Sequence, residues 1–290
     1  MLSLLLNLAV VGLTVGSMYA LLAVSFGLIF NVTHVFHLAH GATFTLGAYA
    51  VYWFSNVVGL PFAVAIVCGL VVAAAFGVLV EVSLYRPLRK AGSPPMILFL
   101  SSVGALIIVE GLVGLSFGTQ SLTFKSLPLE PVVLGPLTVP TANLAMPLSW
   151  LLIAIVVVYM LHSRGGKFLR AVGDSARVAQ ALGISLDAMF GLSFALGSGL
   201  AVFSAVLYGW SQGLTPLMGL NAILIGSAAV IIGGRHGVLP GAIVALALGT
   251  IQAVLVAFVP TGWQEGTTFA LLLIALLIRP QGIFGYSLPW

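Results

Sequence analysis

Residues 1–30 read MLSLLLNLAVVGLTVGSMYALLAVSFGLIF, a stretch without a single acidic or basic side chain. A helix needs about 20 consecutive apolar residues to cross the hydrocarbon core of a bilayer, and this stretch exceeds that length. It is also longer than the roughly 7–15 apolar residues of a secretory signal peptide, and no Lys or Arg precedes it. We therefore expect residues 1–30 to stay in the protein as a first transmembrane helix.

The composition of the whole chain is typical of a membrane protein. Of its 290 residues, 61% are hydrophobic and 6% are charged, whereas soluble domains carry about 25% charged residues. A chain with so few charges cannot keep a folded surface in contact with water. The formal net charge of +4 does not indicate nucleic-acid binding, because the basic residues are confined to a few short loops. The single cysteine, Cys68, excludes an intramolecular disulfide and a cysteine metal cluster.

Nine apolar blocks predict an all-α integral membrane protein, a polytopic bundle of about 8–9 transmembrane helices. Long unbroken runs favour helices, because the strands of a membrane barrel alternate in polarity over about ten residues. The last block is short and the seventh is marginal, so broken or re-entrant helices are an alternative for them. HLAHGATFTLGA and RHGVLPGAIVALALG are loosely alike, which leaves an internal repeat open. The expected spans are Leu4–Phe30, Leu38–Asn56, Phe62–Tyr85, Met96–Phe117, Ala145–Leu161, Ala188–Trp210, Leu217–Ile232, Val238–Val259 and Thr267–Ile278.

The positions of the basic residues predict the orientation of the chain. Loops on the cytoplasmic side of a membrane carry an excess of Lys and Arg. With nine spans and an outside N-terminus, only Lys125 of the ten basic residues falls outside. The expected cytoplasmic residues are Arg86, Arg89, Lys90, Arg164, Lys167, Arg170, Arg177, Arg235 and Arg279.

Three of the five histidines, His34, His37 and His40, lie in the short stretch NVTHVFHLAHGATF. On one helix the three positions would spread over about 120° of arc, an arrangement that could hold a metal ion. No Asp, Glu or Cys lies nearby in the sequence, however. We interpret the stretch as a polar break between two spans, with imidazoles bonded to freed backbone carbonyls or to water.

Two acidic residues lie in or next to apolar blocks. Glu110 is in the middle of GALIIVEGLVGL, and a carboxylate at the bilayer centre costs about 2.5–3.5 kcal/mol on insertion scales. It should therefore face the bundle interior, where it either lines a solute path or ties two helices together. Glu81 is closer to the basic YRPLRK segment, so we expect it to pair with Arg86 or Arg89.

The segment LRAVGDSARVAQALGISLDAMFGLSF is the longest polar interruption on the expected cytoplasmic side. Ala176, Ala179 and Gly183 fall on one face of a short helix, which allows close docking of a partner. Asp174 or Ser175 can cap the start of that helix, and Gly183 suits its end. The alternative is an ordinary basic loop that only sets topology.

Four segments occur in a fixed order over nearly the full chain. They are GSMYALLAVSFGLIFNVTHVFHLAHGATFTLGAYA, EVSLYRPLR, RAVGDSARVAQALGIS, and VIIGGRHGVLPGA with the terminal RPQGIFG. Together they resemble the permeases of branched-chain amino acid importers of the ATP-binding-cassette (ABC) class. The chain departs from that family at HLAHG, where His37 and Leu38 replace Asn and Phe. Further departures are Glu110, where an amide is frequent, and the basic pair of GGRHG.

The resemblance implies a multi-pass permease subunit of the bacterial inner (cytoplasmic) membrane, with residues 1–290 as a single transmembrane domain. Residues 164–186 would be the cytoplasmic coupling loop and residues 118–144 an extracytoplasmic loop. The implied solute is a branched-chain or hydrophobic amino acid, and urea, amides or other small organic compounds are the alternative. The implied translocation-path residues are His37, His40, Gly41 and Glu110. The implied coupling residues are Arg164, Lys167, Arg170, Asp174, Ala176, Arg177, Ala179 and Gly183.

The implied partners supply what this chain lacks. It contains no Gly-x-x-x-x-Gly-Lys-[Ser/Thr] phosphate loop, so we expect this chain to have no enzyme activity, cofactor or metal. We expect partner subunits to use ATP and Mg. The resemblance implies two ATP-binding subunits, an extracytoplasmic solute-binding protein and a second permease, either distinct or identical. The rival is a stand-alone channel or ion-coupled carrier that uses Glu110 and the histidines. A membrane enzyme is disfavoured, because no nucleophile has a nearby base.

Overall fold

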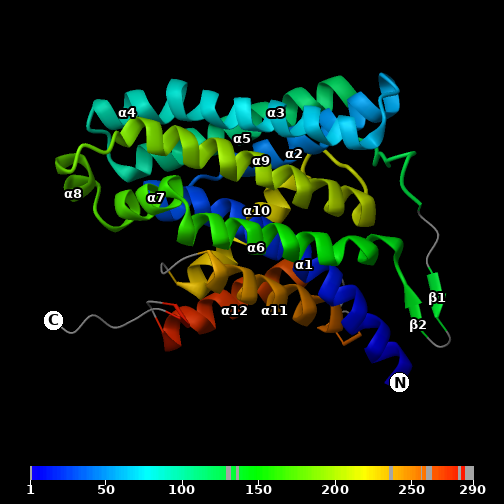
Figure 1. The fold of residues 1–290 in the computed structure, drawn as a ribbon. Helices are drawn as coiled ribbons and strands as arrows, with labels where there is room; N and C mark the ends of the chain where they lie inside the picture. The colour runs from blue at the N-terminus through cyan, green and yellow to red at the C-terminus, as the bar shows by residue number, and fades with distance from the viewer. Residues whose placement is uncertain are drawn as a thin grey trace.

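The computed structural model describes residues 2–128, 132–134, 137–234, 238–255, 257–258, 263–279 and 282–284. Over these residues the chain is a bundle of helices that run side by side, with one small β-hairpin at one end (Figure 1). Each of the nine expected spans contains a helix, so the prediction of an all-α polytopic membrane protein is confirmed. Within the described part of the chain, five helical segments are long and apolar enough to cross a membrane, and three shorter apolar helices follow them.

Two of the spans end in a turn of π-helix, and α6 begins after a short 3-10 helix. The hairpin pairs β1 (Val132–Leu134) with β2 (Leu137–Val139) in antiparallel register. The helices in chain order are α1 (Leu2–Thr33), α2 (Ala39–Tyr52), the π-helix η1 (Trp53–Val57), α3 (Phe62–Val80), the π-helix η2 (Glu81–Tyr85), α4 (Arg86–Lys90), α5 (Pro95–Phe117), the 3-10 helix η3 (Thr141–Ala145), α6 (Met146–His162), α7 (Arg164–Asp174), α8 (Ala176–Ala181), α9 (Leu186–Gln212), α10 (Met218–Gly233), α11 (Leu239–Leu255) and α12 (Gln264–Ile278).

Helices α1 and α9 form the centre of the bundle. α1 packs along both α9 and α11, and its middle residues, 20–24, are fully buried. The α5 helix instead exposes Ile107, Ile108 and Leu115. An outward apolar face of this kind suits a lipid environment, since acyl chains are as apolar as the side chains that face them.

Glycine allows two helix crossings to bring backbones into direct contact. Gly16 of α1 faces Gly249 of α11, and Gly41 of α2 faces Gly219 of α10, and at each position an added Cβ would overlap backbone atoms of the partner helix. Such small-residue contacts are the usual means by which membrane helices approach closely. The first crossing joins α1 to α11, and the second joins α2 to the first turn of α10.

The two ends of the bundle differ in charge. Figure 1 shows α4, α7 and α8 at one end, and the start of α1 and the hairpin at the other. The basic residues of α4, α7 and α8 therefore gather at one end, and Lys125 lies in the loop before the hairpin at the opposite end. This separation agrees with the predicted orientation, although Arg235 lies outside the described residues.

Candidate functional site

The histidine-rich stretch is a break between two helices, as predicted. α1 ends at Thr33 and α2 begins at Ala39. His34 has a φ of 54°, a left-handed conformation that ends a helix because it cannot continue the right-handed turn. Its ring nitrogen Nε2 lies 2.9 Å from the carbonyl oxygen of Gly173 in α7. The break therefore contacts the segment that was expected to couple the chain to a partner.

His37 and His40 are buried, and each contacts a side-chain hydroxyl. His37 Nδ1 lies 2.6 Å from the hydroxyl of Tyr85, and His40 Nε2 lies 2.8 Å from the hydroxyl of Ser25. The ring of Phe194 packs on His37 with the ring centroids 4.9 Å apart. These contacts join the start of α2 to α1, η2 and α9. A role of His37 in lining the path stays a prediction.

Gly41 lies where α2 crosses the start of α10. A Cβ on Gly41 would be only 2.7 Å from the carbonyl oxygen of Gly219, so the backbones of the two helices approach closely here. Met218 and Ala222, in the first turns of α10, are buried. The start of α10 therefore packs against the bundle on one side, while Leu217, directly before it, is 59% exposed. A broken or re-entrant helix in this block stays an alternative.

Glu110 is buried on α5, apart from the histidines. Its carboxyl group lies close to the backbone of Leu220, in the first turn of α10. This contact supports the interpretation that Glu110 ties two helices together. The second carboxylate oxygen, Oε1, has no hydrogen-bond partner among the described residues, so the tie uses only part of the carboxylate.

Glu81 forms the ion pair that its position predicted. Both of its carboxylate oxygens bond to the guanidinium of Arg89, which also lies 4.4 Å from the ring centroid of Phe190. A second ion pair joins Arg86 to Asp187 at 2.5 Å. The first pair joins η2 to α4, and the second pair together with the Arg89–Phe190 contact attaches α4 to the first turns of α9.

The expected coupling loop, residues 164–186, consists of α7, α8 and the turn into α9. The hydroxyl of Ser175 caps α8 by accepting the backbone N–H of Val178 at 3.4 Å. Of the two residues expected to cap α8, Ser175 is therefore the cap, and Asp174 is the last residue of α7. Gly183 follows α8 with a φ of +82°, which confirms its predicted place at the helix end.

The outward face of α8 differs from the one predicted. Ala179 is 1% exposed and packs in the main apolar core, so it cannot be part of a docking face. Leu182 and Val178, by contrast, are 74% and 58% exposed. Small residues here serve internal packing, and larger apolar residues face outward. The remaining predicted coupling residues are all at least partly exposed: Arg164, Lys167, Arg170, Asp174, Ala176, Arg177 and Gly183.

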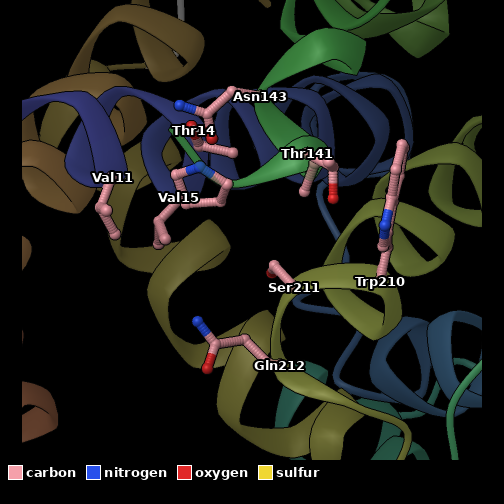
Figure 2. A pocket seen from close by; sticks show the side chains of 10 residues that line it. Val11, Thr14, Val15, Thr141, Asn143, Trp210, Ser211 and Gln212 are labelled. Atoms are coloured by element: carbon pink, nitrogen blue, oxygen red, sulfur yellow. Dashed lines mark hydrogen bonds between the residues drawn. The ribbon is translucent and has the colours of Figure 1, made fainter. Parts of the chain in front are cut away.

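A pocket of about 190 Å³ opens at the opposite end of the bundle, where α1, η3 and the end of α9 meet (Figure 2). Figure 2 shows Trp210, Ser211 and Gln212 across the pocket from Thr14 and Asn143. The Thr14 hydroxyl donates to the side-chain oxygen of Asn143. The pocket is therefore a hollow of mixed polar and apolar lining at the end expected to face the outside.

Hydrogen bonds to one backbone carbonyl fix the rim of this pocket. The Thr141 hydroxyl and the Trp210 indole N–H both donate to the carbonyl oxygen of Pro128, at 2.7 and 2.8 Å. Sequence reasoning missed the pocket, because its walls come from three segments far apart in the chain. The available signal was weak: a Trp and two polar residues directly after an apolar block.

A family model described as "Branched-chain amino acid transport system / permease component" matches residues 8–277. The chain belongs to this permease family. It is 29% identical to the high-affinity branched-chain amino acid transport system permease protein LivH of Escherichia coli K12, over 94% of this chain and 93% of LivH. It is 30% identical to BraD of Pseudomonas aeruginosa, which carries the same description, over 94% of both chains.

The chain has two more distant likenesses. It is 26% identical to the autoinducer 2 import system permease protein LsrC of Klebsiella pneumoniae, over 61% of this chain and 55% of LsrC. The solved structure of PsaBC from Streptococcus pneumoniae in complex with Fab aligns with a TM-score of 0.52 and 14% identity, covering 93% and 91% of the two chains. The second likeness concerns the fold alone. The permease is thus a membrane transport subunit and not, by family, an enzyme.

Proposed function

We propose that this permease is a membrane subunit of an ABC importer in a bacterial inner membrane, and that it forms the path for branched-chain or other hydrophobic amino acids. The similarity to LivH and BraD supports this solute class, because it extends over 94% of the chain. The likeness to LsrC, which is named for another solute, covers 61%. Amino acids are therefore favoured over urea, amides and other small organic compounds.

In this proposal partner chains supply the remaining parts of the importer. Two ATP-binding subunits hydrolyse ATP, a second permease completes the path, and an extracytoplasmic binding protein delivers the solute. The chain offers a different surface at each end. Exposed apolar and basic side chains of α7 and α8 suit the ATP-binding subunits, and the pocket in Figure 2 lies at the end that would receive the solute.

The coupling segment contacts the transmembrane helices in two ways. His34 joins α7 to the break between α1 and α2. α8 leads through one short turn into α9, which is attached to α4 by the Arg86–Asp187 pair. Closure of the ATP-binding subunits would move α7 and α8 and thereby favour one of two helix packings over the other.

Co-purification with identification of every partner tests the proposal. We expect Arg177→Glu and Leu182→Asp to abolish recovery of the ATP-binding subunits, because they place negative charge on the exposed side of α8. Lys125→Glu is the matched control, since it reverses an exposed charge at the other end. Docking on α7 and α8 is wrong if both α8 variants keep the subunits. A lone chain that moves leucine in liposomes without ATP would instead establish the ion-coupled carrier.

A further inference from the structure

An apolar groove of about 300 Å³ runs between α6 and α9, and one residue each of α1 and α3 completes its lining. Among the side chains that line it, only that of Tyr159 contains a polar atom. Leu28 of α1 is 2% exposed and forms the floor, whereas Ile155 of α6 and Leu196 of α9 are 54% and 36% exposed. The groove is therefore open on the side of the bundle that faces away from the core.

The groove is about as long as one leaflet of a bilayer is deep. Its lining extends from Leu152 to Tyr159 on α6 and from Ala195 to Phe203 on α9, which is about 10–12 Å at 1.5 Å per residue. Half of a hydrocarbon core of about 30 Å is about 15 Å. Tyr159 is close to the end of α6 at His162, at the end of the bundle that is predicted to be cytoplasmic. We therefore place the groove in the cytoplasmic leaflet.

The first turn of α7 lies at the cytoplasmic end of the groove. The hydroxyl of Tyr159 contacts the position that a Cβ on Gly165 would take, and the side chain of Leu192 in α9 is 3.8 Å from the same position. Leu192 precedes the groove residue Leu196 by about one helical turn, so the α6 wall and the α9 wall both lead to Gly165. Figure 1 shows α7 next to this end of α6.

This end of the groove is positively charged. Arg164 and Lys167, both in the first turn of α7, are exposed, and neither belongs to the ion pairs that the described residues form. No Asp or Glu occurs in residues 146–173, which make up α6 and nearly all of α7. Asp187, at the start of α9, is already in an ion pair. No carboxylate of the neighbouring helices is therefore left to neutralise the two basic side chains.

We propose that the groove binds one acyl chain of an anionic phospholipid, with the phosphate held by Arg164 and Lys167. Basic groups beside transmembrane helices on the cytoplasmic side suit anionic headgroups, and both side chains donate charge-assisted hydrogen bonds to phosphate oxygens. A helix of a second permease is about 10 Å across, which is too wide to enter a groove of about 300 Å³. An apolar helix would also leave both charges unpaired.

This proposal goes beyond the proposed function and holds for any solute. It assigns the first turn of α7 to lipid and leaves α8 for the ATP-binding subunits. The exposed apolar groove and the unpaired charges are then two parts of one site, because a phospholipid presents its phosphate directly above its acyl chains.

Photo-crosslinking on the intact transporter in nanodiscs tests the site. Two probes carry a diazirine in the middle of the same acyl chain, one with a phosphatidylglycerol headgroup and one with a phosphatidylcholine headgroup. Each is added at the same low mole fraction to phosphatidylcholine discs, and peptide mapping reports the labelled residues of α6 and α9. We expect the anionic probe to label the groove at least about fivefold more than the neutral probe, the scale of one basic residue at an anionic surface.

Exposed residues supply the variants and the controls. Arg164→Gln with Lys167→Gln should bring the ratio of the two probes close to one, because it removes the charges and keeps the apolar groove. Lys90→Gln is the matched control, since Lys90 is exposed at the same end on α4, which does not line the groove. The outward face of α5, with Ile107 and Ile108, reports ordinary boundary lipid, and both probes should label it equally.

Four results would overturn the lipid site. They are equal labelling of the groove by the two probes, the same preference on α5, a preference that survives the loss of both basic residues, and a groove that neither probe labels while α5 is labelled. The last result would show that another protein chain covers the groove. None of these readouts requires transport, so the outcome is independent of the proposed function.

Discussion

Burial decides which of the two ion pairs stabilises this permease. Glu81 is buried beneath Arg89, whereas the side chains of Arg86 and Asp187 are 39% and 41% exposed. We expect Arg89→Ala to lower the free energy of unfolding by about 3–5 kcal/mol, because it leaves a buried carboxylate without its partner. Arg86→Ala should cost about 1 kcal/mol or less. Thermal unfolding of the purified variants in one detergent measures the difference.

The paired replacement Glu81→Gln with Arg89→Met is the control for that comparison. It removes both charges, and we expect it to recover most of the stability lost in Arg89→Ala. An equal Tm for Arg89→Ala and Arg86→Ala would contradict the assignment of the buried pair as the stabilising one.

The backbone of His34 forms the left-handed turn that ends α1, and its ring contacts Gly173. Mutation can separate these two effects. Gly adopts its positive φ easily, so His34→Gly keeps the turn and removes the hydrogen bond to Gly173. On the proposed mechanism, we expect this variant to bind ATP-binding subunits normally and to transport less solute per ATP hydrolysed. His34→Val should instead lower stability by about 1–2 kcal/mol, because its branched side chain resists the left-handed conformation. If His34→Gly transports as much solute per ATP hydrolysed as the wild type, the His34 ring does not take part in coupling.

At the scale of elements, the crossing of α2 and α10 depends on the absence of a side chain. Gly41→Ala places a methyl group 2.7 Å from the carbonyl oxygen of Gly219, so the helices must separate. We expect a loss of about 1–3 kcal/mol, the usual cost of overpacking. Gly104→Ala is the matched change in α5, where a Cβ meets no atom within 4 Å, and it should be neutral or stabilising by up to about 1 kcal/mol. A Tm series in detergent orders the two variants, and a Gly41→Ala protein as stable as the wild type would disprove the tight crossing.

The sequence was sufficient to predict the elements and insufficient to predict how they meet. Long apolar runs revealed the spans, since a bilayer sets a minimum length that the chain must meet locally. The Glu81–Arg89 pair was within reach of the sequence because the residues are two helical turns apart. The His37–Tyr85 and Glu110–Leu220 contacts join residues far apart in the chain. Helix rotation and tilt decide such contacts, and neither leaves a periodic signal in a segment that is apolar all round.

The same limit explains the docking face of α8. Small residues at helical spacing can pack against the chain itself or against a partner, and the pattern alone does not distinguish the two. In the folded chain Ala179 packs inward, and Leu182 is left exposed. The distinction became available only once the position of α7 and α8 on the bundle was known.

At the scale of the whole molecule, the separation of charge predicts which way the chain crosses the membrane. Lys125 and Arg177 are separated by one apolar helical segment, Thr141–His162, of 22 residues. At about 1.5 Å per residue this segment is long enough for a hydrocarbon core of about 30 Å. The two basic residues should therefore lie on opposite sides, with Arg177 on the basic, cytoplasmic side.

Single cysteines at these positions test the orientation in a Cys68→Ala background. We expect a membrane-impermeant maleimide to label Lys125→Cys in spheroplasts and Arg177→Cys only in inside-out vesicles. Both residues are exposed in the chain alone. With this chain expressed without the ATP-binding subunits, failure to react therefore reports the side of the membrane and not burial. Labelling of both from the same side would mean that α6 does not cross. Labelling in the reversed pattern would place α7 and α8 outside, where no ATP-binding subunit can reach them, and would refute the importer assignment as well.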